Sequence, residues 1–257
     1  MTRPATITAH RITLEICVDT PQGLLAAIKG GAQRIELCSA LSEGGLSPSL
    51  GFMNMASTVS VPVRAMIRPR SGDFTYSSDD IGVMRKDILA AASAKLEGVV
   101  LGANLASGAL DEDALIDLVK SARALGLKVA LHRSFDIAPE PHAALDLAIS
   151  LGIDTVLTSG GSKTADAGLS GLRALVKQAQ GRIEILAGSG VTPQNAALIL
   201  ETGVTALHAS CRNIRPFLPG RATDLGYVTP DLRDTDGALV AAFRNHLTHL
   251  ELSHVIR

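Results

Sequence analysis

The sequence predicts a closed barrel of eight parallel strands alternating with helices, the (β/α)8 or TIM-type barrel. Three observations predict it. The chain has 257 residues, and a barrel of this class takes about 250. Short runs rich in Ile, Val and Leu alternate with longer segments whose apolar residues recur at helical spacing. The alternation gives eight candidate strands, whereas a doubly wound sheet usually has about five or six.

The predicted elements follow one another along the whole chain. The strands are expected at Ile12–Cys17, Arg34–Cys38, Val63–Arg68, Glu97–Leu101, Lys128–His132, Thr155–Thr158, Ile183–Ala187 and Thr205–Ser210. The helices are expected at Pro21–Lys29, Ser78–Ala94, Asp111–Leu125, Pro141–Leu151, Gly168–Gln180 and Pro193–Glu201. Thr20 and Thr192 each precede a proline and are typical N-caps, and glycines such as Gly30 and Gly152 stand just past helix ends.

One domain is expected for residues 1–257, with the barrel occupying about residues 12–211. The remaining residues, 212–257, are more than a single closing helix requires. We expect Asn213–Asp234 to form an irregular extension and Asp236–Leu252 to form the last helix. This C-terminal segment is a candidate contact in a homodimer.

Composition excludes several classes of protein. Hydrophobic residues make up 46% and charged residues 19%, which is typical of a globular domain and not of a disordered chain. The formal net charge is −1 and aromatics are 3%, so no nucleic-acid partner is expected. No apolar run is long enough to span a membrane, and MTRPATITAHR lacks the apolar segment of a signal peptide. We therefore expect no membrane partner and a cytoplasmic location.

The first two strands end in similar patterns, Leu14-Glu15-Ile16-Cys17 and Ile35-Glu36-Leu37-Cys38, in which Glu and Cys alternate with Leu or Ile. Because strand side chains alternate between faces, Glu15, Cys17, Glu36 and Cys38 should point into the barrel. Catalytic and binding groups of such barrels lie at the carboxyl ends of the strands. By the same alternation Arg68 and His132 should point inward at that end. One alternative is an internal ion-pair network of Glu15, Glu36, Arg68 and His132 that only fills the mouth of the barrel.

Other polar groups follow the strands and are candidate ligand-binding residues. The loop Gly188-Ser189-Gly190 precedes a helix and is typical of a phosphate site, although its glycines could simply permit a tight turn. A second anion cradle is expected at Ser159 and Gly160, with the same alternative. The remaining candidates are Arg70, Asp73, Asp136, His208 and Ser210. For Arg70 and Asp73 the alternative is a surface turn with a local ion pair.

Cys17 and Cys38 end neighbouring strands, whose axes lie about 4.8 Å apart. Two thiolates at that spacing suit copper(I), which favours sulfur ligands. A third ligand would come from Met66, His132 or His208. Simple packing is the alternative, since free cysteines are often just buried. Three cysteines in so long a chain argue against structural disulfides.

Together these segments resemble the CutC family, which is named for copper homeostasis. The resemblance rests on RIELCSALSEGGLSPS at 34–49, MIRPRSGDFTYS at 66–77, LHRSFD at 131–136, LTSGG at 157–161 and AGSGV at 187–191. It implies a (β/α)8 barrel, a cytoplasmic location and copper binding, with Cys17 and Cys38 where thiol ligands would fall. Ser71 departs from the usual Gly, and HASCR at 208–212 is looser than the family's eighth strand end.

Two functions are compatible with these residues. The first is a cytosolic copper-homeostasis protein that binds copper(I) through Cys17 and Cys38. The alternative is an enzyme, a lyase, isomerase or hydrolase, acting on a small polar substrate that is phosphorylated or sugar-like. In that case Glu36 or His132 is the general acid or base, and Arg68 holds an anionic group.

Overall fold

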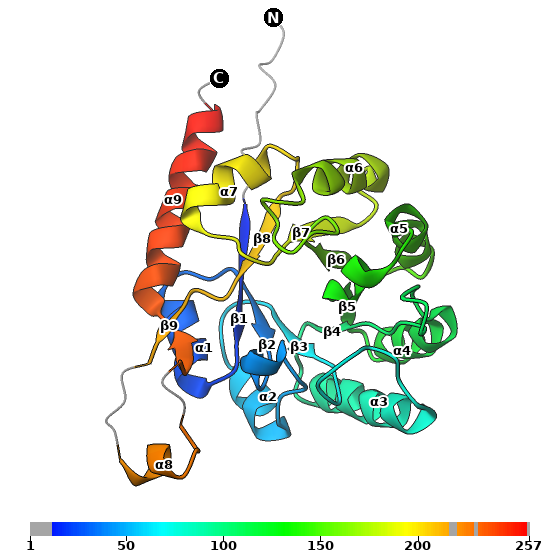
Figure 1. Cartoon of the computed structure of the whole chain (residues 1–257), viewed down its shortest axis with the longest axis horizontal. Coiled ribbons are helices and arrows are strands. Elements are labelled where there is room, and N and C mark those ends of the chain that lie inside the picture. Colours follow the sequence, from blue (N-terminus) through cyan, green and yellow to red (C-terminus); the bar gives the residue numbers. More distant parts are fainter. Residues whose placement is uncertain (1–11, 216–219, 229–230, 256–257) are drawn as a thin grey trace, which may run out of the picture.

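The structure is a computed structural model that describes residues 12–215, 220–228 and 231–255. Its centre is a closed barrel of parallel strands paired in chain order (Figure 1). The strands are β1 (Thr13–Val18), β2 (Arg34–Leu37), β3 (Val63–Met66), β4 (Gly98–Leu101), β5 (Lys128–Leu131), β6 (Thr155–Thr158), β7 (Glu184–Ala187) and β8 (Ala206–Ala209). The predicted (β/α)8 barrel is confirmed.

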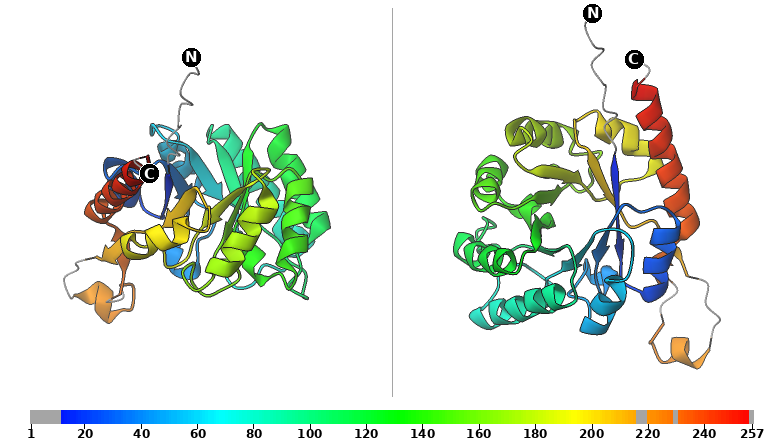
Figure 2. Two further views of the ribbon diagram at one scale, coloured as in Figure 1. Left: turned by 90° about the horizontal axis from the view of Figure 1, so that it is seen from above. Right: turned by 180° about the vertical axis from the view of Figure 1, so that it is seen from behind.

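Helices surround the barrel, as both views in Figure 2 show. They are α1 (Pro21–Lys29), α2 (Leu50–Ala56), α3 (Ser78–Ser93), α4 (Glu112–Ala124), α5 (Pro141–Ser150), α6 (Leu169–Ala179), α7 (Pro193–Leu200) and α9 (Gly237–Val255). Short 3-10 turns η1 (Leu41–Glu43) and η2 (Arg133–Ile137) follow β2 and β5. None of the helices within the described residues is long and apolar enough to cross a membrane.

Side-chain alternation divides each strand between two environments. In β1 and β2 the residues Leu14, Ile16, Ile35 and Leu37 are fully buried in the apolar core that includes the surrounding helices. The residues between them face the barrel interior. Burial of the apolar face is the main stabilising contribution, at about 25 cal/mol per Å² removed from water.

The interior near the amino ends of the strands holds a network of paired charges. We define this N-terminal network as Glu15, Arg34, Arg64, Glu97 and Glu184. Arg34 forms an ion pair with Glu15 and, at 2.9 Å, with Glu184 from β7. Arg64 lies 2.8 Å from Glu97. The Thr155 hydroxyl joins the two parts: it accepts from Arg64 at 2.9 Å and donates to Glu184 at 3.0 Å. Each charge of the network therefore has an opposite partner.

One predicted segment was wrong, and one helix was not located from the sequence. The barrel class implies a helix between the second and third strands, and α2 lies there, capped by Ser49, whose hydroxyl accepts from the Phe52 amide. With seven residues, α2 is too short to give a clear helical period. The segment 213–234 was predicted as irregular, but it includes β9 (Arg212–Ile214) and a short helix α8 (Arg221–Asp224), and it leads into β10 (Arg233–Thr235).

The C-terminal segment packs against the outside of the barrel. Strands β9 and β10 pair antiparallel outside the barrel, and α9 then packs against α1 and α7 (Figure 1). Gly30 permits a close approach, because a Cβ there would lie 2.6 Å from the Cβ of Val240. Arg244 ties α9 to the first strand by donating to the Ile12 carbonyl at 2.8 Å. The homodimer expected for this segment stays a prediction.

Candidate functional site at the carboxyl end of the barrel

A cavity of about 1060 Å³ opens at the carboxyl ends of the strands. Its walls come from several strands and from α9. The strand residues include Cys17, Glu36, Met66, Arg68, His132 and His208, and α9 adds Leu239, Phe243 and His246. The contribution of α9 was not predicted from the sequence, since it depends on how the C-terminal segment folds back over the barrel.

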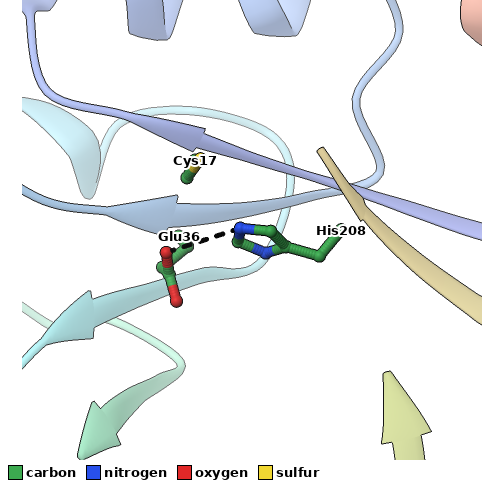
Figure 3. A group of neighbouring side chains, drawn as sticks. All are labelled: Cys17, Glu36 and His208. Carbon is green, nitrogen blue, oxygen red and sulfur yellow. Dashed lines mark ion pairs between the residues drawn. The ribbon is translucent and has the colours of Figure 1, made fainter. Parts of the chain in front are cut away.

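Cys17, Glu36 and His208 form a compact cluster on one wall (Figure 3). Their potential ligand atoms all lie within 4.8 Å of one another. The His208 Nε2 is 3.8 Å from Glu36 Oε2. The Cys17 thiol donates to the Ala209 carbonyl at 3.7 Å. The cluster exists because β8 pairs with β1 in a register that sets His208 opposite Glu15, while Cys17 lies opposite Glu36.

Glu15 connects this cluster to the N-terminal network. One carboxylate oxygen pairs with Arg34, and the other lies 2.8 Å from Nδ1 of His208. Burial alone would raise the pKa of Glu15, but Arg34 and then His208 hold it well below its usual range. For Glu15 this arrangement matches the alternative of an internal ion-pair network.

The titrating groups of the cluster affect one another. Burial disfavours a charged His208 ring, yet the neighbouring Cys17 and Glu36 raise its pKa well above the usual value. Burial, followed by the charge of Glu15, raises the pKa of Glu36. Glu36 Oε1 is buried and has no hydrogen-bond partner. The cluster is therefore prepared to accept a cation or a hydrogen-bond donor.

Cys38 has a different environment from Cys17. It is fully buried beside Met66, Val100 and Ala130, and its thiol donates to Glu36 Oε2 at 3.5 Å. Burial, reinforced by the charge of Glu36, raises the pKa of this thiol well above its usual value. Cys17 lies opposite Glu36 in the pairing of β1 with β2. Cys38 is two residues beyond Glu36, just after the end of β2, so it does not lie opposite Cys17. The geometry favours Cys17 with His208 over the expected pair of thiols.

Arg68 and His132 lie on the cavity wall formed by β3 and β5, with Phe74 between them. The Arg68 guanidinium carbon is 4.9 Å from the centroid of the Phe74 ring, and the Phe74 and His132 centroids are 4.8 Å apart. The Ser134 amide donates to Nδ1 of His132 at 3.2 Å. Burial, followed by the charge of Arg68, lowers the pKa of His132 to about 3. The ring is therefore neutral, and its proton is on Nε2.

The comparisons with known proteins agree with this architecture. A model of the CutC family matches residues 12–213. The chain belongs to the CutC family. The family protein CutC of Rhizobium meliloti strain 1021 is 48% identical over 92% of this chain and 96% of its own length. The one from Caulobacter vibrioides is 49% identical over 91% of this chain and 96% of its own length.

A solved structure of a relative is also similar. It is CutC from Streptococcus agalactiae, described as a candidate copper homeostasis protein. It superimposes with a TM-score of 0.73 at 32% identity, covering 77% of this chain and 97% of that chain. The resemblance stated from the sequence is thus confirmed at the level of the family.

Not every predicted ligand-binding residue of this CutC-family chain has a free polar group. Asp136 lies under the loop after β6 and accepts from the amides of Ser159 and Gly161, each at 3.2 Å or less, and from the Ser159 hydroxyl. The amide of Gly160 donates to Thr158. The chain's own carboxylate therefore occupies the donors expected to bind an anion there. Asp136 also pairs with Arg133 at 2.8 Å.

The loop after β7 has more of its donors free. Gly188 donates to the Thr158 carbonyl, and the Ser189 hydroxyl donates to the Lys163 carbonyl. Ser189 and Gly190 both have positive φ and line the cavity, as does the exposed Ser210 from the loop after β8. An anion at this edge stays a prediction.

Arg70 and Asp73 lie outside the cavity wall. They pair with each other at 3.0 Å in an exposed turn, and the Arg70 guanidinium lies 5.2 Å from the centroid of the Tyr76 ring. This arrangement matches the surface turn considered as the alternative. Phe74 and Arg212 also line the cavity, although neither was a predicted site residue. Phe74 lies inside the segment 66–77 that carries the family resemblance, which was the available signal.

Proposed function

We propose that this CutC-family chain binds copper(I) at the mouth of its barrel, through Cys17 and His208 with Glu36 alongside, as part of cellular copper homeostasis. The observation that carries the proposal is the cluster of potential ligand atoms within 4.8 Å of one another. A thiol and an imidazole are ligand types that suit copper. The description of the Streptococcus agalactiae relative as a candidate copper homeostasis protein supports the same role.

The surroundings of His208 also support a metal ligand. Histidines that bind metals usually donate their second ring nitrogen to a carboxylate or carbonyl, which fixes the ring and raises its basicity. Here Nδ1 lies 2.8 Å from Glu15, so Nε2 faces Glu36 and is the nitrogen available to a metal. Copper would displace the protons of both ligands on binding. A cytoplasmic location, where thiols stay reduced, belongs to the proposal.

Anaerobic titration with copper(I) against a chromophoric chelator tests this proposal. We expect one ion per chain, with affinity greatly reduced by Cys17→Ser and by His208→Asn. Glu15→Gln should weaken binding by about 10- to 100-fold through the orientation of His208. Cys211→Ser is the matched control, since this third thiol lies outside the cluster, and it should bind like the wild type. Wild-type affinity in Cys17→Ser would exclude the proposed site.

Cys38→Ser distinguishes the ligand pair Cys17 and His208 from the pair Cys17 and Cys38 that was predicted from the sequence. If Cys17 and His208 are the ligands, Cys38→Ser should change copper affinity less than His208→Asn does. The opposite order would restore the two-thiol site. X-ray absorption at the copper edge should show sulfur and nitrogen in the first coordination shell.

A second candidate function is an enzyme acting on a small polar substrate by acid–base chemistry. The size of the cavity, about 1060 Å³, favours it, because sites for small molecules have volumes of about 300–1,000 Å³ and an ion needs far less. Glu36, with an unpartnered oxygen, would be the base. His132 would act as a hydrogen-bond donor, because Nδ1 already accepts from Ser134. Turnover of a metabolite by metal-free protein, lost in Glu36→Gln, would support this function over copper binding.

A further inference from the structure

Arg68 differs from the other buried arginines of the barrel. Among the described residues the buried arginines are Arg34, Arg64 and Arg68. Arg34 has two carboxylate partners and Arg64 has one. Within the same described part of the chain, no carboxylate lies within 4.0 Å of Arg68, although it is only 5% exposed. A buried cation without a counter-charge costs several kcal/mol, so the missing partner indicates a ligand.

The hydrogen bonds of Arg68 hold its side chain in place without neutralising it. Nη1 donates to the carbonyls of Glu43, at 2.6 Å, and Gly45, at 3.0 Å. Nη2 donates to the carbonyl of Gly72 at 2.8 Å. Nε is buried and has no hydrogen-bond partner. Two loops thus position the guanidinium rigidly through three of its five N–H groups, while Nε–H has no hydrogen-bond partner and the charge has no counter-ion among the described residues.

His132 supplies a second donor next to it. Its Nε2 is buried and has no partner, while Nδ1 accepts from Ser134. The ring is fixed from two sides. Phe74 stacks at 4.8 Å between centroids, and Gly102 lies so close that a Cβ there would be 2.6 Å from Cε1 of His132. The Nδ1–Cε1 edge of the ring packs closely against Gly102, and His132 is one of the residues that line the cavity.

We propose that the mouth cavity contains a second subsite, for a small organic carboxylate whose oxygens accept from Arg68 Nε and His132 Nε2. The charge of the carboxylate supplies the counter-ion that Arg68 lacks. Leu41, Met66 and Phe74 line the cavity next to these donors, and such apolar walls suit the carbon skeleton of an organic acid better than an inorganic anion. The subsite rests on β3 and β5 and is independent of the copper cluster on β1, β2 and β8.

Binding of acetate, pyruvate and succinate to metal-free full-length protein tests this subsite. Thermal shift and isothermal titration, with sodium chloride and inorganic phosphate at matched ionic strength, give the comparison. We expect saturable binding of at least one of the three carboxylates, with an upward shift in Tm. The side-chain Nε2–H resonance of His132 should move during the titration. If none of the three binds saturably, or if phosphate binds in their place, the organic-acid subsite is wrong.

Substitutions can distinguish binding at this subsite from nonspecific attraction of carboxylates to the exposed arginines around the cavity. Arg68→Lys keeps the charge but loses Nε, and His132→Phe keeps the stacked ring but loses the donor. Each should weaken carboxylate binding by at least about ten-fold, equivalent to about 1.4 kcal/mol. Circular dichroism shows whether each variant is folded. If only one of the two variants folds, that variant alone is enough for the test. Arg233→Gln, at an exposed cavity-lining position, is the control and should bind as the wild type does. Equal affinity in all three variants would overturn the assignment.

Discussion

The two ends of the barrel interior differ in whether their buried charged and polar groups have partners. In the N-terminal network each charged group has an opposite partner, and Arg34 and Arg64 share the link through Thr155. At the carboxyl end Glu36, Arg68 and His132 each keep a buried polar atom without a partner. Removing one partner of a buried ion pair destabilises a fold, and a buried polar group without a partner is costly unless a ligand binds. We therefore call the two ends the structural end and, following the proposals above, the binding end, which is where ligands bind in this fold.

Loss of Glu15 should give the largest effect, because it belongs to both ends. Glu15→Gln leaves Arg34 with one carboxylate and removes the anion beside His208. We expect the free energy of unfolding to fall by about 3–5 kcal/mol, as for a broken buried ion pair. Urea denaturation at pH 7 measures it. A loss below about 1 kcal/mol would contradict a structural role for the network.

The pH dependence of the free energy of unfolding provides a second test of the role of Glu15. Despite burial, Arg34 and His208 hold the pKa of Glu15 below its ordinary value of 4.5. A depressed carboxyl pKa contributes stability that is present above the unfolded pKa and is lost as pH falls toward the folded one. The difference between wild type and Glu15→Gln should therefore stay constant between about pH 5 and 6.5 and shrink below pH 4.5. Above pH 6.5 it should shrink again as pH rises toward the raised pKa of His208, to which the bond with Glu15 contributes.

At the binding end, His132 should affect stability in a different pH range. Burial and Arg68 lower its pKa from 6.5 to about 3. Below pH 6.5 the unfolded chain binds a proton that the folded chain does not, so stability decreases as pH falls. Relative to His132→Phe, the wild type should lose about 1.4 kcal/mol per pH unit between pH 6.5 and 4.5.

Urea denaturation of both proteins at several pH values measures this loss. Between about pH 5 and 6.5 the contribution of Glu15 is constant, so in that range the two ends can be distinguished by pH alone. The nitrogen resonances of His132 should also show no titration above about pH 5. A parallel pair of stability curves, or a His132 ring that titrates near 6.5, would show that the wall holding Arg68 and His132 is more open to water than the structure indicates.

The sequence was sufficient for the barrel but not for the partners at its mouth. The eight strands could be predicted because apolar runs alternate with helical periods, and the inward side of Glu15 or Arg68 follows from the two-residue period of a strand. The contacts between inward-facing residues, however, depend on how the barrel closes. Glu15 and His208 are 193 residues apart and touch only because β8 pairs with β1. No local pattern carries that information.

The assignment of the two thiols illustrates the same limit. Cys17 and Cys38 end strands with the same alternation of Leu or Ile with Glu and Cys, so the two thiols cannot be distinguished from the sequence. The register of β1 against β2 makes them different, with Cys17 beside His208 and Cys38 buried against Met66. Similarly, the loop glycines at 160 and 161 suggested an anion site, but Asp136 already accepts from the Gly161 amide. Such internal anions cannot be recognised before the loop is folded.

The smallest expected effect concerns the glycine that holds the His132 ring. Gly102→Ala places a Cβ 2.6 Å from Cε1 of His132 and against the Ser134 hydroxyl, so the ring must move. We expect a loss of about 1–3 kcal/mol, typical of overpacking, together with weaker carboxylate binding. Gly82→Ala is the matched control: Gly82 lies within α3 with no atom within 4 Å of the added Cβ, and alanine there should stabilise by about 0.5–1 kcal/mol. Denaturation and carboxylate titration of both variants measure these effects. If Gly102→Ala were as stable as Gly82→Ala and bound carboxylates normally, the His132 ring would be free to shift, and the binding end would owe nothing to rigid placement of its donors.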